Sequence, residues 1–329
     1  MHRVKRTASS KSKTSQKRYI SNSLRGRDLL SIDDLSAEEV LHLFRLTAEM
    51  KKKPLTFRKS LDGKMIALIF EKPSLRTRTT FAVGIKQLGG DSIYLSPAEI
   101  SLGKRESVHD VAKNLERMVE GVMIRTFGHD VCTSFALHCD KPVINGLTDL
   151  EHPCQALADF FTITEFKKDI RSLKLTYIGD GNNVVHSLML TAAKLGAHLF
   201  VAVPDRYQPS QEILMRSREI AAVTGATIVI TNDPVEASDN ADMIYTDAWA
   251  SMGQEAEAAE RRAIFKPYQV NKELFSHAKP DALFMHCLPA HRGEEVVDDV
   301  IDSPNSVVFQ EAENRLHIEK AIMHELLRD

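Results

Sequence analysis

Short, uninterrupted apolar runs alternate with helix-like segments along most of this chain. The run at 64–70, KMIALIF, precedes RTRTTFAVGIKQLGG, in which Phe81, Ile85 and Leu88 recur at helical spacing before two glycines end the pattern. Further strand-like runs are SIYLS, GVMIRT and PVING, separated by helical patterns such as VHDVAKNLERMV. Because parallel strands are buried on both faces and need helical crossovers, this alternation predicts an α/β fold with a parallel sheet.

The same alternation starts again after the apolar-faced helical segment HPCQALADFFTITEF. Five strand candidates follow, KLTYIGD, HLFVAVP, TIVIT, ADMIYTD and LFMHCL, and EAENRLHIEKAIMHELL near the C-terminus has the pattern of a long amphipathic helix. A length of 329 residues leaves room for about two domains. We therefore expect two α/β domains, each a parallel sheet flanked by helices, with ligands in the cleft at the carboxyl ends of the strands.

Charge is distributed unevenly along the chain. Residues 1–27 contain nine Lys/Arg and no acid, although the whole chain has a formal charge of −2. That near-neutral total argues against a dedicated nucleic-acid binder, and no apolar run approaches the roughly 18 residues of a membrane span. We interpret residues 1–23 as a basic, disordered tail, with organellar targeting or RNA contact as alternatives. The four cysteines form no C-x-x-C pair, which excludes zinc ribbons and fits a reducing cytoplasm.

The segment EKPSLRTRTTF joins an apolar run to a helix and is typical of an anion site. Ser74 is placed to cap the helix, which would leave the amides of Leu75, Arg76 and Thr77 as free donors at its N-terminus. Arg76 and Arg78 add planar guanidinium groups that match phosphate oxygens. The alternative is an ordinary capped helix whose arginines pair with surface acids, but two arginines on one first turn favour a phosphate site.

Two further segments place polar side chains at the ends of buried elements. Arg125 ends the run GVMIRT, where its charge needs a partner, so it is either a structural ion-pair member or a ligand-binding residue. His152 and Gln155 lie three residues apart at the start of a helix and therefore share one face. Together they can donate to a carbonyl oxygen and accept from an amide nitrogen, although a histidine beside a helix N-cap is also common without any function.

Two loops in the second half follow predicted strands. YIGDGNNVV resembles a dinucleotide-binding turn, but Val184 occupies the third glycine position, so a nicotinamide site is disfavoured and the turn presents Asn182 and Asn183. In DAWASMG, Asp247 ends a strand and precedes a Ser-Met-Gly loop. A fixed carboxylate there suits a cationic amine ligand, and a solvated loop acid is the alternative.

The last chemistry-bearing segment is FMHCLPAHRG. Cys287 is either a small buried hydrophobe or a thiol at a reacting centre. A Cys-His hydrolase using His286 or His291 is conceivable, but adjacent residues on a strand point to opposite faces, which disfavours His286.

Taken together, SLRTR, HPCQ, DGNN, DAWASMG, HCLPA and EAENR occur in this order, and over residues 24–329 the chain resembles the ornithine carbamoyltransferase family, in its bacterial type. The resemblance implies a carbamoyl-phosphate-binding domain at 24–155 plus 312–329, and an ornithine-binding domain at 156–311. It also implies a homotrimer with active sites between subunits. The implied reaction moves the carbamoyl group of carbamoyl phosphate to the δ-amine of L-ornithine, giving citrulline and phosphate in arginine metabolism, with no metal and no organic cofactor.

The resemblance assigns roles to residues that match the family's motifs. Those expected to be catalytic are Arg125, His152, Asp247 and Cys287. The residues expected to bind carbamoyl phosphate are Ser74, Leu75, Arg76, Thr77, Arg78, Arg125, His152, Gln155, Cys287, Leu288 and Arg315. The residues expected to bind ornithine are Asn183, Asp247, Ser251 and Met252.

The chain departs from the family's pattern at two positions. Leu75 stands where the family usually has threonine, which removes one hydroxyl. Ser101 stands where relatives often carry a glutamine or histidine that reaches a neighbouring subunit, so the intersubunit contact stays open. Relatives that use putrescine or N-acetylornithine are the alternative within the class. A binding protein that uses its basic tail on nucleic acid is the alternative outside enzymes.

Overall fold

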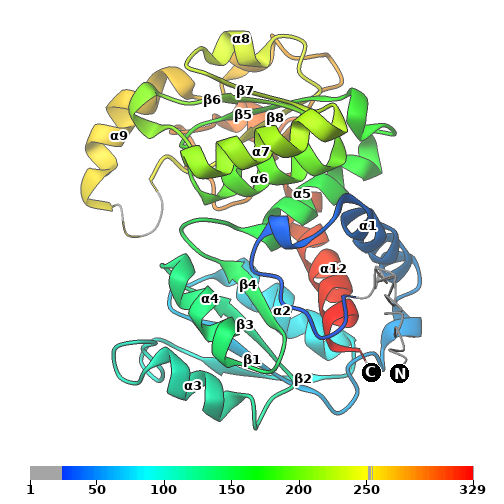
Figure 1. The fold of residues 1–329 in the computed structure, drawn as a ribbon. Coiled ribbons are helices and arrows are strands. Elements are labelled where there is room, and N and C mark those ends of the chain that lie inside the picture. The colour runs from blue at the N-terminus through cyan, green and yellow to red at the C-terminus, as the bar shows by residue number, and fades with distance from the viewer. Residues whose placement is uncertain (1–23, 251–252, 254, 329) are drawn as a thin grey trace, which may run out of the picture.

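The computed structural model describes residues 24–250, 253 and 255–328. This part of the chain forms two parallel sheets, one above the other in Figure 1. The first sheet has the order β2-β1-β3-β4, with strands β1 (Met65–Phe70), β2 (Asp91–Leu95), β3 (Gly121–Arg125) and β4 (Val143–Leu147). The second has the order β7-β6-β5-β8-β9, with strands β5 (Lys174–Ile178), β6 (His198–Ala202), β7 (Thr227–Thr231), β8 (Met243–Thr246) and β9 (Leu283–His286). The predicted two-sheet α/β fold is confirmed, whereas the expected N-terminal tail lies outside the described residues.

Helices cover both faces of the first sheet. These helices are α2 (Leu75–Gln87), α3 (Val108–Leu115) and α4 (His129–His138). Alternate strand residues point to opposite faces, so Ile66 and Leu68 join the core on the α2 side while Ala67 and Ile69 join the core under α3 and α4. This two-sided burial explains why the strands read as continuous apolar runs.

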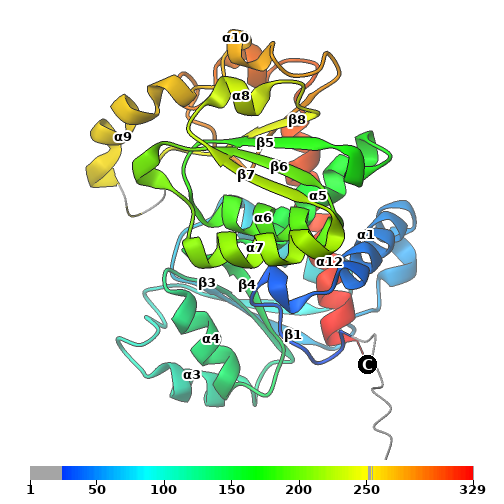
Figure 2. The ribbon, with the colours of Figure 1, turned by 45° about the horizontal axis from the view of Figure 1, so that its top comes forward.

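The second sheet is covered in the same way. Helices α6 (Asn183–Leu195) and α7 (Gln211–Thr224) pack on one face, as Figure 2 shows from in front. The other face carries the shorter helices α8 (Pro234–Ser238), α10 (Lys272–Phe275) and α11 (Asp298–Ile301), while α9 (Ala258–Phe265) extends from the side. Helix α6 ends at Gly196, which adopts the left-handed conformation with φ +77°.

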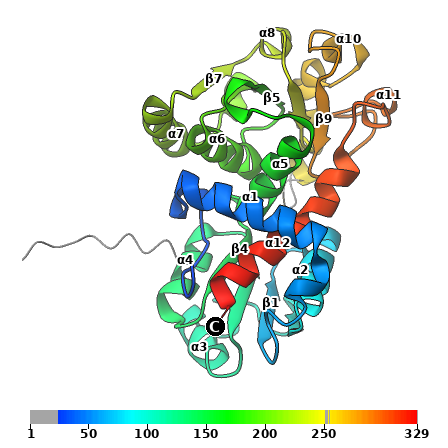
Figure 3. The ribbon, with the colours of Figure 1, turned by 90° about the vertical axis from the view of Figure 1, so that its right-hand side faces the viewer.

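Three helices connect the sheets: α1 (Ala37–Lys52), α5 (Pro153–Phe166) and α12 (Val308–Leu327). The last of these contacts both α1 and α5, and Figure 3 shows it crossing between the two sheets. One continuous apolar core therefore runs through the connecting helices into both halves of the molecule. The expected amphipathic pattern of α12 is only partly realised, because its charged residues Glu311, Arg315 and Glu319 are also buried, each 3% exposed or less. A helix with neighbours on most sides has little surface left for them.

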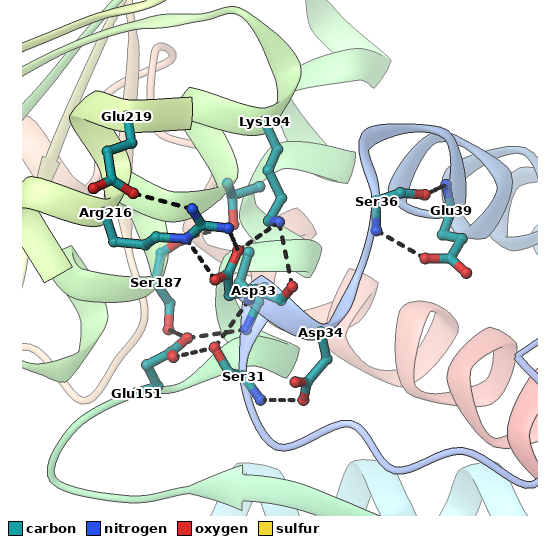
Figure 4. A network of polar contacts seen from close by, with 12 residues as sticks. Ser31, Asp33, Asp34, Ser36, Glu39, Glu151, Ser187, Lys194, Arg216 and Glu219 are labelled. Atoms are coloured by element: carbon teal, nitrogen blue, oxygen red, sulfur yellow. Dashed lines mark hydrogen bonds and ion pairs between the residues drawn. The ribbon is translucent and has the colours of Figure 1, made fainter. Parts of the chain in front are cut away.

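The N-terminal segment is fastened to the helices of the second sheet by charged side chains (Figure 4). Ser36 and Glu39 form a capping box at the start of α1. Just before it, Asp33 accepts from Lys194 of α6 at 2.9 Å and from Arg216 of α7 at 2.7 Å. These ion pairs link the segment before α1, which lies beside the first sheet, to helices α6 and α7 of the second sheet.

No helix among residues 24–250 and 255–328 has the length and apolar character needed to cross a lipid bilayer.

Candidate active site

A cleft of about 1430 Å³ opens between the two sheets at the carboxyl ends of their strands. One wall is formed by residues 72–76, which follow β1, and by the ends of β3 and β4. The other wall is formed by residues 180–184 after β5, 247–250 after β8 and 287–289 after β9. Six strand ends thus bring together segments that are far apart in the sequence.

The turn from β1 into α2 forms the floor of the first wall. As predicted, Ser74 is the N-cap of α2, and its Oγ accepts from the amide of Thr77 at 3.2 Å. The expectation that three amides stay free is therefore wrong for Thr77, because its N–H is used by the cap. The amides of Leu75 and Arg76 belong to the first turn, which has no acceptor of its own. Leu75 lines the cleft and is 77% exposed.

Guanidinium groups gather beside this turn. Arg76, Arg125 and Arg315 line the cleft, and Arg125 and Arg315 are only 6% and 3% exposed. Arg125 makes no ion pair to any described carboxylate, and its Nη1 lies 3.4 Å from the hydroxyl of Thr77. Burial, together with the neighbouring Arg315 and Arg76, lowers the pKa of Arg125 to about 9. Buried positive charges with so few neighbouring acids to balance them favour the binding of an anion strongly.

Arg315 comes from α12 and completes this cluster. Its Nη2 donates to the hydroxyl of Thr77 at 2.8 Å and to the carboxylate of Glu319 at 3.1 Å. Thr77 is fully buried, and its hydroxyl contacts both arginines from the side away from the cleft. The role predicted for Thr77 in carbamoyl phosphate binding stays a prediction.

Arg78 is also not brought to the cleft. Its guanidinium lies over the ring of Tyr94, 3.8 Å from the ring centre, and the side chain is exposed. On a helix, Arg76 and Arg78 are two positions apart and therefore point to different sides. The sequence alone shows two arginines in one turn, but the helical geometry allows only one of them to face the strand ends.

His152 and Gln155 lie where α5 begins, and both line the cleft, as expected. The ring of His152 is 4% exposed, and its Nδ1 has no hydrogen-bond partner among the described residues. Burial and the neighbouring Arg315, Arg125 and Arg76 hold the pKa of His152 well below its usual range. The imidazole is therefore neutral at physiological pH, with one N–H to donate.

Asp247 and Cys287 face each other on the opposite wall. The thiol of Cys287 lies 3.0 Å from Oδ1 of Asp247, which also accepts from the amide of Ala248 at 2.8 Å. Burial, followed by the charge of Asp247, raises the pKa of Cys287 well above its ordinary value. The cysteine is thus a protonated thiol that orients a carboxylate, and Asp247 retains oxygen lone pairs for a cationic amine.

The remaining predicted residues lie around this pair. Leu288 lines the cleft next to Cys287 and holds a left-handed backbone, with φ +58°. Asn183 also lines the cleft, and its Nδ2 donates to the backbone oxygen of Thr148 at 2.6 Å, across the two halves of the molecule. Ser251 and Met252, expected to bind ornithine, lie outside the described residues.

Asn182 and Lys72 are among the polar residues of the cleft to which the sequence analysis gave no binding role. Asn182 caps α6 and donates to Oδ2 of Asp247 at 2.8 Å, so it fixes the carboxylate from the side opposite Cys287. Lys72 is 3% exposed, pairs with Asp149 and lies 4.3 Å from the ring centre of Phe127. The sequence pointed to Asn182 because it lies in the turn that follows a predicted strand. Nothing in the sequence pointed to Lys72 except its position before Pro73.

The geometry does not support a nucleophilic Cys287 activated by His286. Nε2 of His286 lies 3.1 Å from Glu295, and its Nδ1 accepts from the amide of Leu288 at 2.8 Å. Both ring nitrogens of His286 are therefore engaged away from Cys287. Gly181 of the turn after β5 serves chain packing, because a Cβ there would lie 2.4 Å from backbone atoms of residues 207–209.

The fold and the site together define a two-domain α/β enzyme of the group-transfer class. One wall of the cleft carries three arginines, and the other carries the carboxylate of Asp247. Comparison with known proteins supports this. The carbamoyl-P binding domain of the aspartate/ornithine carbamoyltransferases matches residues 27–165, and their Asp/Orn binding domain matches residues 171–326. The chain belongs to the aspartate/ornithine carbamoyltransferase family.

Individual relatives agree with this assignment. The ornithine carbamoyltransferase of Thermococcus kodakarensis is 54% identical over 307 residues, which cover 92% of this chain and 96% of the relative. That of Bacillus subtilis is 50% identical and covers 93% and 95%. Among solved structures, the ornithine carbamoyltransferase of Pyrococcus furiosus superposes with a TM-score of 0.90 at 50% identity, covering 93% of this chain and 98% of that one.

Proposed function

We propose that this protein transfers the carbamoyl group of carbamoyl phosphate to the δ-amine of L-ornithine, giving L-citrulline and phosphate in arginine metabolism. The observation that carries the proposal is the pairing of two walls. One wall carries a cluster of arginines, and among the described residues no acid forms an ion pair with Arg125. Across the cleft lies the carboxylate of Asp247, which Asn182 and Cys287 hold in place. The family and its relatives named above support the same reaction.

On the donor side, the phosphate group of carbamoyl phosphate binds the amides at the start of α2 and the guanidinium groups of Arg76, Arg125 and Arg315. The neutral ring of His152 donates to the carbamoyl oxygen, and Arg125 lies close enough to share that oxygen. As the amine attacks, negative charge grows on this oxygen, and fixed donors there commonly provide the largest part of catalysis. Gln155 and the backbone oxygens of Cys287 and Leu288 accept from the carbamoyl NH₂.

On the acceptor side, the side chains of Asp247 and Asn183 hold ornithine, together with the loop that contains Ser251 and Met252. An alkylammonium has a pKa of about 10.4, so forming the neutral amine at pH 7.5 costs about 4 kcal/mol. A water-poor cleft lowers this cost because it disfavours the charged form. The new C–N bond forms as the C–O bond to phosphate breaks, and the leaving phosphate takes the proton.

The test is citrulline formation from carbamoyl phosphate with four amines in parallel: ornithine, N-acetylornithine, putrescine and aspartate. We expect ornithine to have the highest kcat/KM, because a free α-amino acid is what the carboxylate and amide groups of the second wall can hold. A preference for putrescine or N-acetylornithine would replace the substrate while keeping the reaction class. No turnover with any amine would contradict the proposal altogether.

The organisation of the chain is part of the same proposal. We assign residues 24–155 with 312–329 to the carbamoyl phosphate domain and residues 156–311 to the ornithine domain, joined by α5 and α12. We further propose a homotrimer, as the family resemblance implies. We also propose a cytoplasmic location, which the buried free thiols of Cys132, Cys139 and Cys154 support because reducing compartments keep thiols free. Light scattering should then give a particle of three chains of 36.9 kDa each.

A further inference from the structure

Two carboxyl groups are buried directly behind the donor side of the cleft. Asp159 of α5 and Glu311 of α12 are both 0% exposed. Nε2 of Gln155 donates to both of them, at 2.7 Å to Oδ1 of Asp159 and at 3.1 Å to Oε1 of Glu311. None of the roles derived above uses either acid, and a buried carboxyl is costly to keep without a purpose or a partner.

Glu311 makes further contacts that fix its position. The hydroxyl of Tyr245 lies 3.2 Å from Oε1, and the backbone amide of His286 donates to Oε2 at 3.0 Å. Each oxygen of Glu311 therefore accepts from a group on the second sheet, next to Cys287. The pair connects α5 and α12, which lie side by side in Figure 3, with the ends of β8 and β9.

The two acids cannot both be charged in so dry a place. Burial raises the pKa of Asp159 to about 7, and burial with the neighbouring Asp159 raises the pKa of Glu311 well above its usual range. The groups that face the pair are Gln155, Tyr245, the backbone of His286 and, at longer range, Arg315 and Cys287. Because the two groups lie close together, each one disfavours the charged form of the other, and they titrate as a coupled pair.

The consequence falls on the amide of Gln155. An amide nitrogen has two hydrogens, and the two acids take both. Oε1 is left without a partner among the described residues, although the side chain is 1% exposed and lines the cleft. The opposite orientation of the amide would place its carbonyl oxygen against the two carboxyl oxygens that now accept from Nε2, and would present a donor to the cleft instead of an acceptor.

We propose that Asp159 and Glu311 are positioning residues that lock the amide of Gln155 with its Oε1 toward the cleft, as an acceptor specific for the NH₂ group of the acyl donor. This rests on the proposed function, because it names what that group meets. It also gives the site a rule for choosing its donor. Carbamoyl phosphate offers N–H groups to Oε1, whereas acetyl phosphate has the same shape with a methyl group that offers none.

The test compares Asp159→Leu with Asp159→Asn. Leucine removes the acceptor at similar volume, whereas asparagine keeps an oxygen toward Gln155. We expect D159L to raise the KM for carbamoyl phosphate about tenfold, the usual range for one buried hydrogen bond that becomes misdirected. The KM for ornithine and the inhibition constant of acetyl phosphate should stay within about twofold of wild type, and D159N should remain close to wild type in all three.

A second variant and a double-mutant cycle separate positioning from general damage. E311Q puts an amide nitrogen where N–H or O–H groups of Gln155, Tyr245 and His286 already point, so we expect the same selective rise in the KM for carbamoyl phosphate. In a Gln155→Leu background, neither change should have a further effect on that KM. Additive effects in this cycle, or equal weakening of carbamoyl and acetyl phosphate, would overturn the inference. Failure of the wild-type protein to form citrulline would instead overturn the proposed function.

Discussion

Arg315 donates to the hydroxyl of Thr77 at 2.8 Å, although 238 positions separate the two residues in the chain. The same hydroxyl lies 3.4 Å from Nη1 of Arg125. A single small side chain at the start of α2 thus holds the arginine that ends β3 and the arginine of the last helix. The anion side of the cleft exists only when α2, β3 and α12 are packed together.

Thr77→Val should therefore weaken the binding of carbamoyl phosphate without removing any charge. Valine has the shape of threonine but offers no acceptor to the two arginines, so both lose a fixed orientation. We expect the KM for carbamoyl phosphate to rise about tenfold, in line with hydrogen bonds to charged groups. Steady-state kinetics would measure this, with Thr77→Ser as the matched control that restores the hydroxyl. Equal defects in both variants would show that the methyl group matters and the hydroxyl does not.

Arg76 and Arg78 provide an internal comparison within one helical turn. Arg76 lines the cleft, while Arg78 lies over Tyr94 and is exposed. Arg76→Ala should lower kcat/KM for carbamoyl phosphate by about a hundredfold, because it removes a charged hydrogen bond to the phosphate. Arg78→Ala should change it by less than about threefold, as for an exposed side chain. A large effect of Arg78→Ala on binding would place that guanidinium at the ligand after all.

The thiol of Cys287 should behave as a weak nucleophile. Burial and Asp247 raise its pKa well above the ordinary value, so the reactive thiolate is scarce at neutral pH. We expect alkylation by iodoacetamide, read by mass spectrometry at this residue, to keep accelerating with pH beyond 9 without reaching a plateau. Cys287→Ser, which keeps a donor toward Asp247, should retain more turnover than Cys287→Ala. Rapid alkylation at pH 7 would contradict the role of the thiol as an orienting donor.

Glu151 gives the stability of the protein a definite dependence on pH. Its carboxylate accepts from Oγ of Ser31 at 2.5 Å, from the amide of Ile32 at 3.1 Å and from Oγ of Ser187 at 3.1 Å, and Figure 4 shows it between the two serines. No cation pairs with it among the described residues. Burial is the main cause that raises the pKa of Glu151 to about 7.

The folded state thus holds a proton on Glu151 more tightly than the unfolded chain, where the pKa is about 4.3. Between these values, folding stability falls as pH rises, and the loss is complete above the folded pKa. The size of this loss is up to about 4 kcal/mol for a shift from about 4.3 to about 7. Glu151→Gln cannot ionise, so we expect the stability of the variant relative to wild type to increase from pH 5 to pH 8.5. Urea unfolding of both proteins at both pH values, at equal protein concentration, measures the difference in their free energies of unfolding. If this difference is the same at pH 5 and pH 8.5, the prediction is wrong.

Local sequence signals predicted the elements of this fold well, because they depend on neighbours a few residues away. The apolar run at 64–70, the cap at Ser74 and the left-handed glycine at Gly196 each report a nearby backbone requirement. They also placed Arg125 and Asp247 correctly at strand ends. Since parallel strands end at one edge of a sheet, these residues had to lie near a common cleft.

Other features required the three-dimensional packing. The sequence shows Arg76, Thr77 and Arg78 as equivalent members of one motif, yet the orientation of α2 sends one to the cleft, one to the interior and one to Tyr94. Nothing local marks Asp159 and Glu311 as neighbours, since they meet only where α5 and α12 pack.

The sequence by itself determined the strands, the helices and the chemical groups that this protein has available. The tertiary structure decided which of those groups are deprived of water and of counter-ions. Burial of Arg125 and His152 beside other cations, and of Cys287 beside a carboxylate, depends on contacts between distant segments. Because a charge is costly only where water is excluded, the reactivity of the site is a property of the packed molecule and not of its motifs.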